Sequence, residues 1–311
     1  MNDDLPADLD PVVDFFGLNG PATVTKDFHV VAAIAAITAL DAAPFALVFG
    51  GGTALARAHK LVQRMSEDVD FKIVPLPTAP TSRNGQRRAL GDLTDKVTTA
   101  LQMANFAFDP ADPAHTRSRN ENRYTIWQLP YAAPSQGLRP TIQIELTYAP
   151  MRRSPVPRSV SSFVAEAFNR PPEVPNIPCV SVTETAAEKL VALTRRVAME
   201  LAGLSRDRDP TLIRHVYDLH MMHAQVDPTE VATLAREIAA ADADVFRNQY
   251  PAYAADIAGE TGKALDTLND VPEHRERYDR FVADMAYGER PAFATAMQCV
   301  NDLAKTAWGN R

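Results

Sequence analysis

The pattern of apolar residues in the first third of the chain predicts two short strands around a glycine turn. Residues 45–49 form a continuous apolar run, which is typical of a strand buried on both faces. Residues 50–52 are all glycine, and an alanine-rich helix is expected to begin at Thr53. Residues 69–74 predict a second strand that Pro75 ends. The turn therefore joins a buried strand to the N-terminus of a helix.

The remaining pattern predicts an α+β fold. It indicates a small mixed β-sheet with flanking helices, followed by a mainly α-helical C-terminal region. Two further strands are expected from alternation, at residues 124–129 and 141–148. Helices are expected at residues 28–40, 90–101, 182–204, 211–224, 228–241 and 273–287. Ser181 or Thr183 is suited to cap the first helix of the C-terminal region.

Proline and charge suggest where the domains begin and end. Residues 1–25 are polar, acidic and interrupted by prolines, so we expect an N-terminal arm. Residues 26–160 are expected to form the core domain, and the proline-rich residues 161–180 a linker. Residues 181–311 are then expected to form the helical C-terminal domain.

The composition is that of a globular protein with ordinary cores. The chain has 311 residues, 46% hydrophobic and 23% charged, and no apolar run approaches the roughly 20 residues that span a bilayer. Its two cysteines argue against a disulfide framework and favour a reducing compartment, so we expect a cytoplasmic protein that does not enter a membrane. The net charge is −7, but arginines are concentrated in one segment, which leaves both a basic surface and ordinary solvated charge possible. They are Arg83, Arg87, Arg88, Arg117, Arg119, Arg123, Arg139, Arg152, Arg153 and Arg158.

The glycine turn is suited to bind phosphate. Glycine lets a phosphate approach the backbone, and a helix N-terminus offers unpaired N–H donors. Gly51, Gly52 and Thr53 do not match a Walker loop or a dinucleotide fingerprint. Taken alone, such a turn is more often purely structural.

An Asp-x-Asp pair follows on the second strand. Asp68 and Asp70 lie at positions i and i+2, so both side chains point to one face, roughly 6.6 Å apart along the strand. Two neighbouring carboxylates repel each other, and a divalent cation such as Mg²⁺ or Mn²⁺ is their natural partner. The alternative is a solvated strand end.

Together these features resemble the signature of polymerase-beta-type nucleotidyltransferases, and more closely the AbiEii-type toxins that include the mycobacterial MenT proteins. The shared pattern is a strand, Gly-Gly-Thr, an Ala/Leu helix and Arg-x-Ser-x-Asp-hydrophobic-Asp. The matching residues are Gly51, Gly52, Thr53, Ala54, Leu55, Arg64, Ser66, Asp68 and Asp70. The resemblance implies that the glycine turn, with Arg64 and Ser66, binds a nucleoside triphosphate and that the aspartates bind the metal.

Two family motifs recur in the second half of the chain. Lys189 and Arg196 match a helical lysine motif, and the resemblance implies that they contact phosphates, although solvated charge is the plain alternative. Asp218 matches the second acid of an Arg-Asp-x-x-Asp-Leu motif in which His215 replaces the first. We expect Asp218 to act with Lys189 in catalysis, by orienting Lys189 or Arg214 rather than by removing a proton.

Glu145 is the candidate for a third metal ligand. It lies on the strand predicted at residues 141–148, on the face shared with Gln143, opposite the apolar face of Ile144 and Leu146. Members of the superfamily often carry a third carboxylate on a neighbouring strand. An exposed sheet-face glutamate is the alternative.

The resemblance implies a toxin that adds nucleotides to the 3′ end of tRNA and so blocks translation. Its partners would then be a nucleoside triphosphate, tRNA and a co-encoded antitoxin that does not necessarily form a stable complex. Two alternatives stay open: nucleotidylation of a protein or small-molecule hydroxyl, and a non-catalytic nucleotide-binding regulator. The intact Asp68 and Asp70 argue against the regulator.

Overall fold

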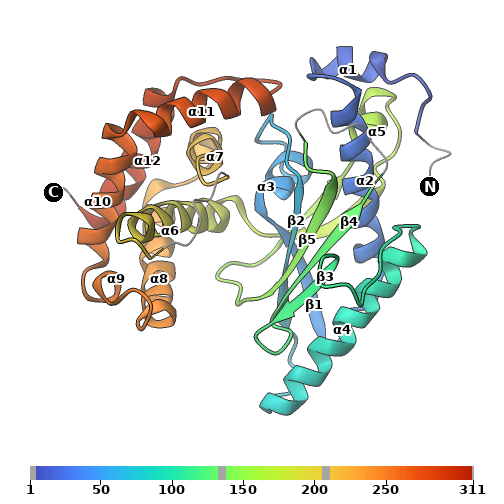
Figure 1. The fold of residues 1–311 in the computed structure, drawn as a ribbon, viewed down its shortest axis with the longest axis horizontal. Coiled ribbons are helices and arrows are strands. Elements are labelled where there is room, and N and C mark those ends of the chain that lie inside the picture. Colours follow the sequence, from blue (N-terminus) through green and yellow to red (C-terminus); the bar gives the residue numbers. More distant parts are fainter. Residues whose placement is uncertain (1–4, 132–137, 205–210, 310–311) are drawn as a thin grey trace. The chain divides into compact units, whose positions relative to one another are not determined.

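The chain folds into two compact units. The computed structural model describes residues 5–131, 138–204 and 211–309. The first unit is Met1–Val180 and the second is Ser181–Arg311. Figure 1 shows that the first unit is built on a β-sheet with helices and that the second is helical.

A seven-stranded mixed sheet with the order β3-β4-β5-β2-β1-β7-β6 forms the centre of the first unit. Its central strand β2 is antiparallel to β1 and parallel to β5. The strands are β1 (Phe45–Gly50), β2 (Asp68–Pro75), β3 (Thr116–Arg119), β4 (Tyr124–Pro130), β5 (Thr141–Tyr148), β6 (Val156–Val160) and β7 (Val174–Cys179). The four predicted strands are confirmed, since β1, β2, β4 and β5 fall where the apolar run and the alternating pattern placed them.

The first unit also contains helices, and α2 and α4 pack on one face of the sheet. The helices are α1 (Asp10–Phe16), α2 (Pro21–Thr38), α3 (Gly51–Thr53), the π-helix η2 (Ala54–Ala58), α4 (Arg83–Met103) and α5 (Phe163–Ala167). Apolar residues of α2 and α4, including Ile34 and Leu93, join Phe71 and Trp127 of the sheet in one buried cluster. This cluster is the core of the unit.

The two faces of the sheet differ in polarity. Along β2, Val69 and Phe71 are buried in the core, whereas Asp68 and Asp70 alternate with them and are only partly buried. Along β5, Ile144 and Leu146 belong to the same core. We call the opposite side, which carries the aspartates, the carboxylate face.

Two segments contain more regular structure than the sequence predicted. The expected N-terminal arm contains α1 and the start of α2, with Pro11 and Pro21 in the first helical turns. A proline there removes no intrahelical hydrogen bond, so it begins a helix instead of breaking one. The expected linker at residues 161–180 contains α5 and β7. Strand β7 pairs with β1 through the single register position Phe49–Cys179.

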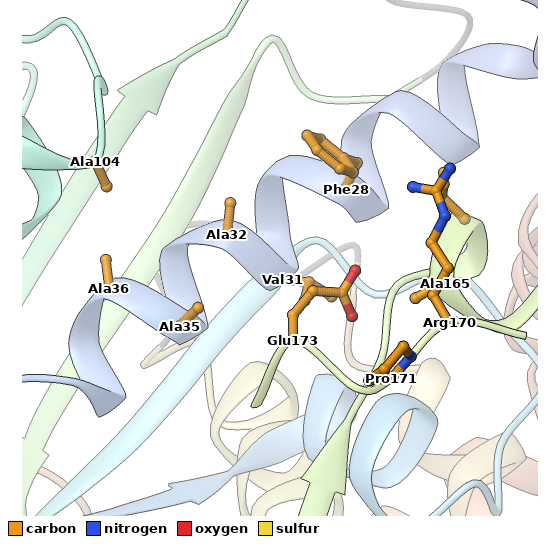
Figure 2. A pocket seen from close by; sticks show the side chains of 11 residues that line it. Phe28, Val31, Ala32, Ala35, Ala36, Ala104, Ala165, Arg170, Pro171 and Glu173 are labelled. Atoms are coloured by element: carbon orange, nitrogen blue, oxygen red, sulfur yellow. The ribbon is translucent and has the colours of Figure 1, made fainter. Parts of the chain in front are cut away.

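A cavity of about 460 Å³ lies beside α2 in the first unit (Figure 2). Phe28, Val31 and alanines of α2 line one part of it together with Ala104, and residues of α5 and of the segment after it, including Arg170 and Glu173, line the rest. Val31, also in the lining, belongs to the same buried cluster as Phe71. The cavity is therefore on the core side of the sheet, away from the carboxylate face.

The second unit contains only helices among its described residues. They are α6 (Val182–Leu201), α7 (Arg214–Met222), the 3₁₀ turn η3 (His223–Gln225), α8 (Pro228–Phe246), α9 (Pro251–Ala255), α10 (Ile257–Asp270), α11 (Pro272–Met285) and α12 (Phe293–Trp308). Helix α6 packs against α8 and α10, and α12 packs against α7 and α8. Ser181 caps α6 by accepting a hydrogen bond from the Glu184 amide at 3.2 Å. In the described parts of the chain, no helix combines the length and apolarity needed to cross a bilayer.

Candidate active site

The glycine turn lies directly against the Asp-x-Asp strand. Gly50 pairs with Asp70 in the antiparallel ladder of β1 and β2. Gly51 has a φ of +70°, in the left-handed region that favours glycine, and a Cβ at this position would collide with Asp70 Oδ2. The Asp70 carboxylate therefore packs directly on the backbone where helix α3 begins.

Gly52 is in close contact with Arg64 and Ser66 of the Arg-x-Ser-x-Asp motif. A Cβ at Gly52 would collide with Arg64 Nη2 and lie 2.9 Å from Ser66 Oγ. Arg64 is buried and donates a hydrogen bond to the Met65 carbonyl at 3.0 Å. The two motif residues thus cover the turn, and only glycine leaves room for them.

Thr53 fixes the turn to the strand. Its hydroxyl donates a short hydrogen bond to the Asp68 carbonyl, and its side chain is buried. The structure therefore brings together the sequence-predicted residues Gly51, Gly52, Thr53, Arg64, Ser66, Asp68 and Asp70.

Glu145 lies next to the aspartates on the carboxylate face. In the parallel register of β2 and β5, Asp70 is opposite Glu145 and Asp68 is opposite Gln143. The Glu145 carboxylate accepts hydrogen bonds from the Tyr124 hydroxyl at 3.0 Å and from the Gln143 side-chain amide. Burial, together with the charge of Glu145, raises the pKa of Tyr124, so the phenol stays protonated and can donate.

The donor set suits a hard divalent cation, although it is not a closed metal cage. In the described residues, no group of three or more His, Cys, Asp or Glu side chains converges as a ligand set. Asp68 Oδ1 is a buried oxygen that accepts no hydrogen bond of good geometry, although the Arg139 guanidinium lies 2.8 Å from it, and Asp70 Oδ2 lies over the bare backbone of Gly51. Carboxylate oxygens with ligand positions left open for phosphates are what Mg²⁺ and Mn²⁺ use in phosphoryl-transfer sites. The residues present therefore fit such an ion.

A charged network that the sequence did not predict borders Asp68. Arg139 Nη2 lies 2.8 Å from Asp68 Oδ1, and Lys26 Nζ lies 2.6 Å from Glu67 Oε1. Burial opposes the charge of Glu67, but the hydrogen bond from Lys26 and the nearby Arg139 outweigh it and hold the Glu67 pKa below its usual value. For the pair of Lys26 and Glu67, the sequence offered only a lysine within an apolar helix and a glutamate inside the Arg-x-Ser-x-Asp motif.

The remaining predicted residues lie in the second unit. Lys189 Nζ on α6 lies 2.8 Å from Asp218 Oδ2 on α7, and Asp218 is fully buried. Lys189 Nζ also lies 3.4 Å from His215 Nδ1, the residue that replaces the usual first acid. Arg196, two turns further along α6, is exposed. The unit thus holds one buried lysine–aspartate pair and one exposed arginine on the same helix.

Comparison with known proteins agrees with this geometry. The family model described as the nucleotidyl transferase AbiEii toxin of type IV toxin–antitoxin systems matches residues 35–299. The chain is therefore a nucleotidyltransferase and belongs to the AbiEii toxin family. Membership implies a nucleoside triphosphate as substrate and a co-encoded antitoxin. A search of curated protein sequences gives no significant match.

Among solved structures, the chain is similar to MenT4, a nucleotidyltransferase toxin from Mycobacterium tuberculosis H37Rv. The TM-score is 0.51 at 16% sequence identity, over 98% of this chain and 95% of that one. This likeness supports the fold, and the predicted α+β class is confirmed.

Proposed function

We propose that the protein adds nucleotides from a metal-bound nucleoside triphosphate to the 3′ end of tRNA in the cytoplasm. One observation carries the first half of this proposal: the Asp70 carboxylate packs on Gly51, at the beginning of a helix. A metal ligand and a phosphate-binding turn are therefore in direct contact, which is what a metal–triphosphate complex requires.

Each residue of the first unit has a role in this proposal. The backbone amides after Gly51 would bind phosphate oxygens. Arg64 and Ser66 would hold the turn in place through their close contacts with Gly52. Asp68 and Asp70 would hold Mg²⁺ or Mn²⁺, with Glu145 as the third carboxylate. A bound ion would supply charge neutralisation on the triphosphate and lower the pKa of an attacking hydroxyl.

Lys189, Asp218 and Arg196 belong to the second unit, and we assign them to the same reaction because they match the family's motifs. Lys189 is the phosphate-binding cation, and Asp218 orients its ammonium group through the 2.8 Å ion pair. Arg196 would add a second positive charge for phosphate on the exposed side of α6.

Arginines at the edge of the sheet support RNA as the acceptor. Arg117 is opposite Ile126 and Arg119 is opposite Tyr124 in the register of β3 and β4. Residues that are opposite each other share a sheet face, and Tyr124 hydrogen-bonds Glu145. Both arginines are exposed, so the carboxylate face carries exposed positive charge at its edge, which suits a nucleic-acid backbone.

The test is to incubate the protein with each labelled nucleoside triphosphate, Mg²⁺ and total cellular RNA, and then to separate RNA from protein. Label in the tRNA fraction, lost in Asp70→Asn, is the expected result. Label on protein or on a small molecule would instead favour another acceptor. The absence of transfer to any acceptor would favour a nucleotide-binding regulator.

A further inference from the structure

Arg139 makes a three-way contact beside the predicted metal site. Its Nη2 lies 2.8 Å from Asp68 Oδ1 and donates a hydrogen bond to Asp68 Oδ2 at 2.9 Å. Its Nη1 donates to Gln143 Oε1 at 3.2 Å, and its Nε lies 3.6 Å from Glu67 Oε2. All three nitrogens of the guanidinium therefore face polar atoms of β2, β5 or the residue before β2.

The backbone of Arg139 is held from both sides. Its amide donates to Glu67 Oε1 at 2.7 Å, and its carbonyl accepts from Lys26 Nζ at 2.7 Å. Lys26 also donates to the Thr141 carbonyl at 3.1 Å, and Lys26 and Glu67 are themselves buried and paired. The guanidinium is thus aimed at Asp68 by a buried scaffold, unlike an arginine that swings freely at the surface.

The guanidinium and a divalent cation need the same oxygens. Mg²⁺ and Mn²⁺ bind carboxylate oxygens at about 2.0–2.2 Å and require their lone pairs. Arg139 already faces both oxygens of Asp68. A metal ion at Asp68 would compete with Arg139 for the lone pairs of these oxygens and would repel the guanidinium, so the contact is weakened and the guanidinium gains from another anionic partner. A triphosphate provides one, because guanidinium groups bind phosphate oxygens well.

We propose that Arg139 is the counter-cation of Asp68 in the metal-free protein and moves to the triphosphate when metal and nucleotide bind together. This inference rests on the proposed metal-dependent function. Arg139 is then a positioning residue that couples the binding of the two ligands. The metal ion binds weakly alone, because it competes with the guanidinium for Asp68. It binds more tightly when a triphosphate is present to pair with the guanidinium.

The experiment is a titration with Mn²⁺, in which free Mn²⁺ is measured by electron paramagnetic resonance, with and without a non-hydrolysable triphosphate analogue. For Arg139→Gln, we expect the affinity for Mn²⁺ alone to increase roughly tenfold, equivalent to about 1.4 kcal/mol. The gain from adding the analogue should become smaller than in the wild type. Arg139→Lys, which keeps the charge and the backbone contacts, should shift in the same direction by less.

Arg88→Gln is the matched control, because it removes the same charge from an exposed position on α4. It should bind Mn²⁺ as the wild type does, and Asp68→Asn should bind it more weakly. Wild-type protein that binds no Mn²⁺ even with the analogue would overturn the metal-dependent function itself. Normal wild-type binding, combined with unchanged or weaker binding in Arg139 variants whose thermal unfolding matches the wild type, would overturn only the role of Arg139. Damage to the fold would weaken binding, so it cannot imitate the expected gain.

Discussion

Gly51 and Asp70 are in direct contact, and no side chain fits between them. A Cβ on Gly51 would occupy the position of Asp70 Oδ2, and the φ of +70° is itself unfavourable for other residues. Gly51→Ala should therefore displace the carboxylate and abolish nucleotide transfer. Transfer and triphosphate binding would be measured together with thermal unfolding.

Gly17 offers a matched control for this substitution. Its φ is +65°, almost the same as that of Gly51, but a Cβ there would meet nothing within 4 Å. Because alanine is unfavourable at this φ, Gly17→Ala should lower the free energy of unfolding by about 1–2 kcal/mol, as at Gly51. Nucleotide transfer should stay at the wild-type rate. Equal activity of the two variants would show that the contact between Gly51 and Asp70 has no role in the reaction.

Asp70 is expected to be required for transfer but not for folding. It is one of two neighbouring carboxylates on the partly exposed face of β2, so removing its charge relieves repulsion when no metal is bound. Asp70→Ala should lose transfer by more than about a hundredfold, with little change in the free energy of unfolding. Asp92→Asn, at an exposed position on α4, is the control for charge. A folded Asp70→Ala protein with wild-type activity would contradict the proposed role.

The sequence could predict the turn and the aspartates because their geometry is local. Alternation along β2 is enough to place Asp68 and Asp70 on one face. Arg139 could not be predicted, because its contact with Asp68 depends on the register between β2 and β5. The same holds for Lys26, whose partner Glu67 lies 41 residues away.

The prolines between residues 150 and 180 led to the linker prediction, but proline is also compatible with a strand at the edge of a sheet. Pro157 lies on β6, an edge strand of the sheet, and its partner Pro178 lies on β7, which pairs with β1 only at Phe49–Cys179. Proline lacks an N–H donor, so it is tolerated where a strand has no further neighbour to bond. Proline-rich sequence is therefore compatible with an edge strand as well as with a linker.

The Lys189–Asp218 pair should show strong coupling in unfolding experiments. Both side chains are buried, so Lys189→Met leaves a buried carboxylate without its 2.8 Å partner. We expect this change to cost about 3–5 kcal/mol. Adding Asp218→Asn removes the stranded charge, so the double variant should be more stable than Lys189→Met alone. Additive effects in urea unfolding would exclude the coupling.

Glu67 should make the stability of the first unit depend on acid pH. Its pKa in the folded protein is below the ordinary value of 4.5, so its ionised form stabilises the fold above that pH. This contribution is lost as the pH falls below 4.5 and through the folded pKa. Glu67→Gln should therefore be less stable than the wild type at pH 7, and the gap should narrow in acid. Urea unfolding at a series of pH values measures the gap, and a gap of constant size would refute the assignment.

Two pairs of arginines in the first unit should determine how strongly RNA binding responds to salt. We expect Arg152 and Arg153, which follow β5 in the chain, to contact phosphates together with Arg117 and Arg119 on β3. Each phosphate contact contributes about 0.7–0.9 of a log unit of affinity per tenfold change in salt. Reversing either pair to Glu should reduce this slope and the labelling of tRNA, while triphosphate binding is preserved.

The two arginine pairs can be distinguished by the same measurements. Arg117 and Arg119 lie on the face shared with Tyr124, so reversing them should impair transfer by misplacing the acceptor as well as by weakening its binding. Arg153 Nη1 donates to the Arg152 carbonyl, so reversing that pair also removes a local hydrogen bond, and thermal unfolding controls for this loss. If neither double reversal changes the salt slope, these arginines do not bind the acceptor. If tRNA labelling also stays at the wild-type level, the RNA must approach the carboxylates from a surface without these arginines.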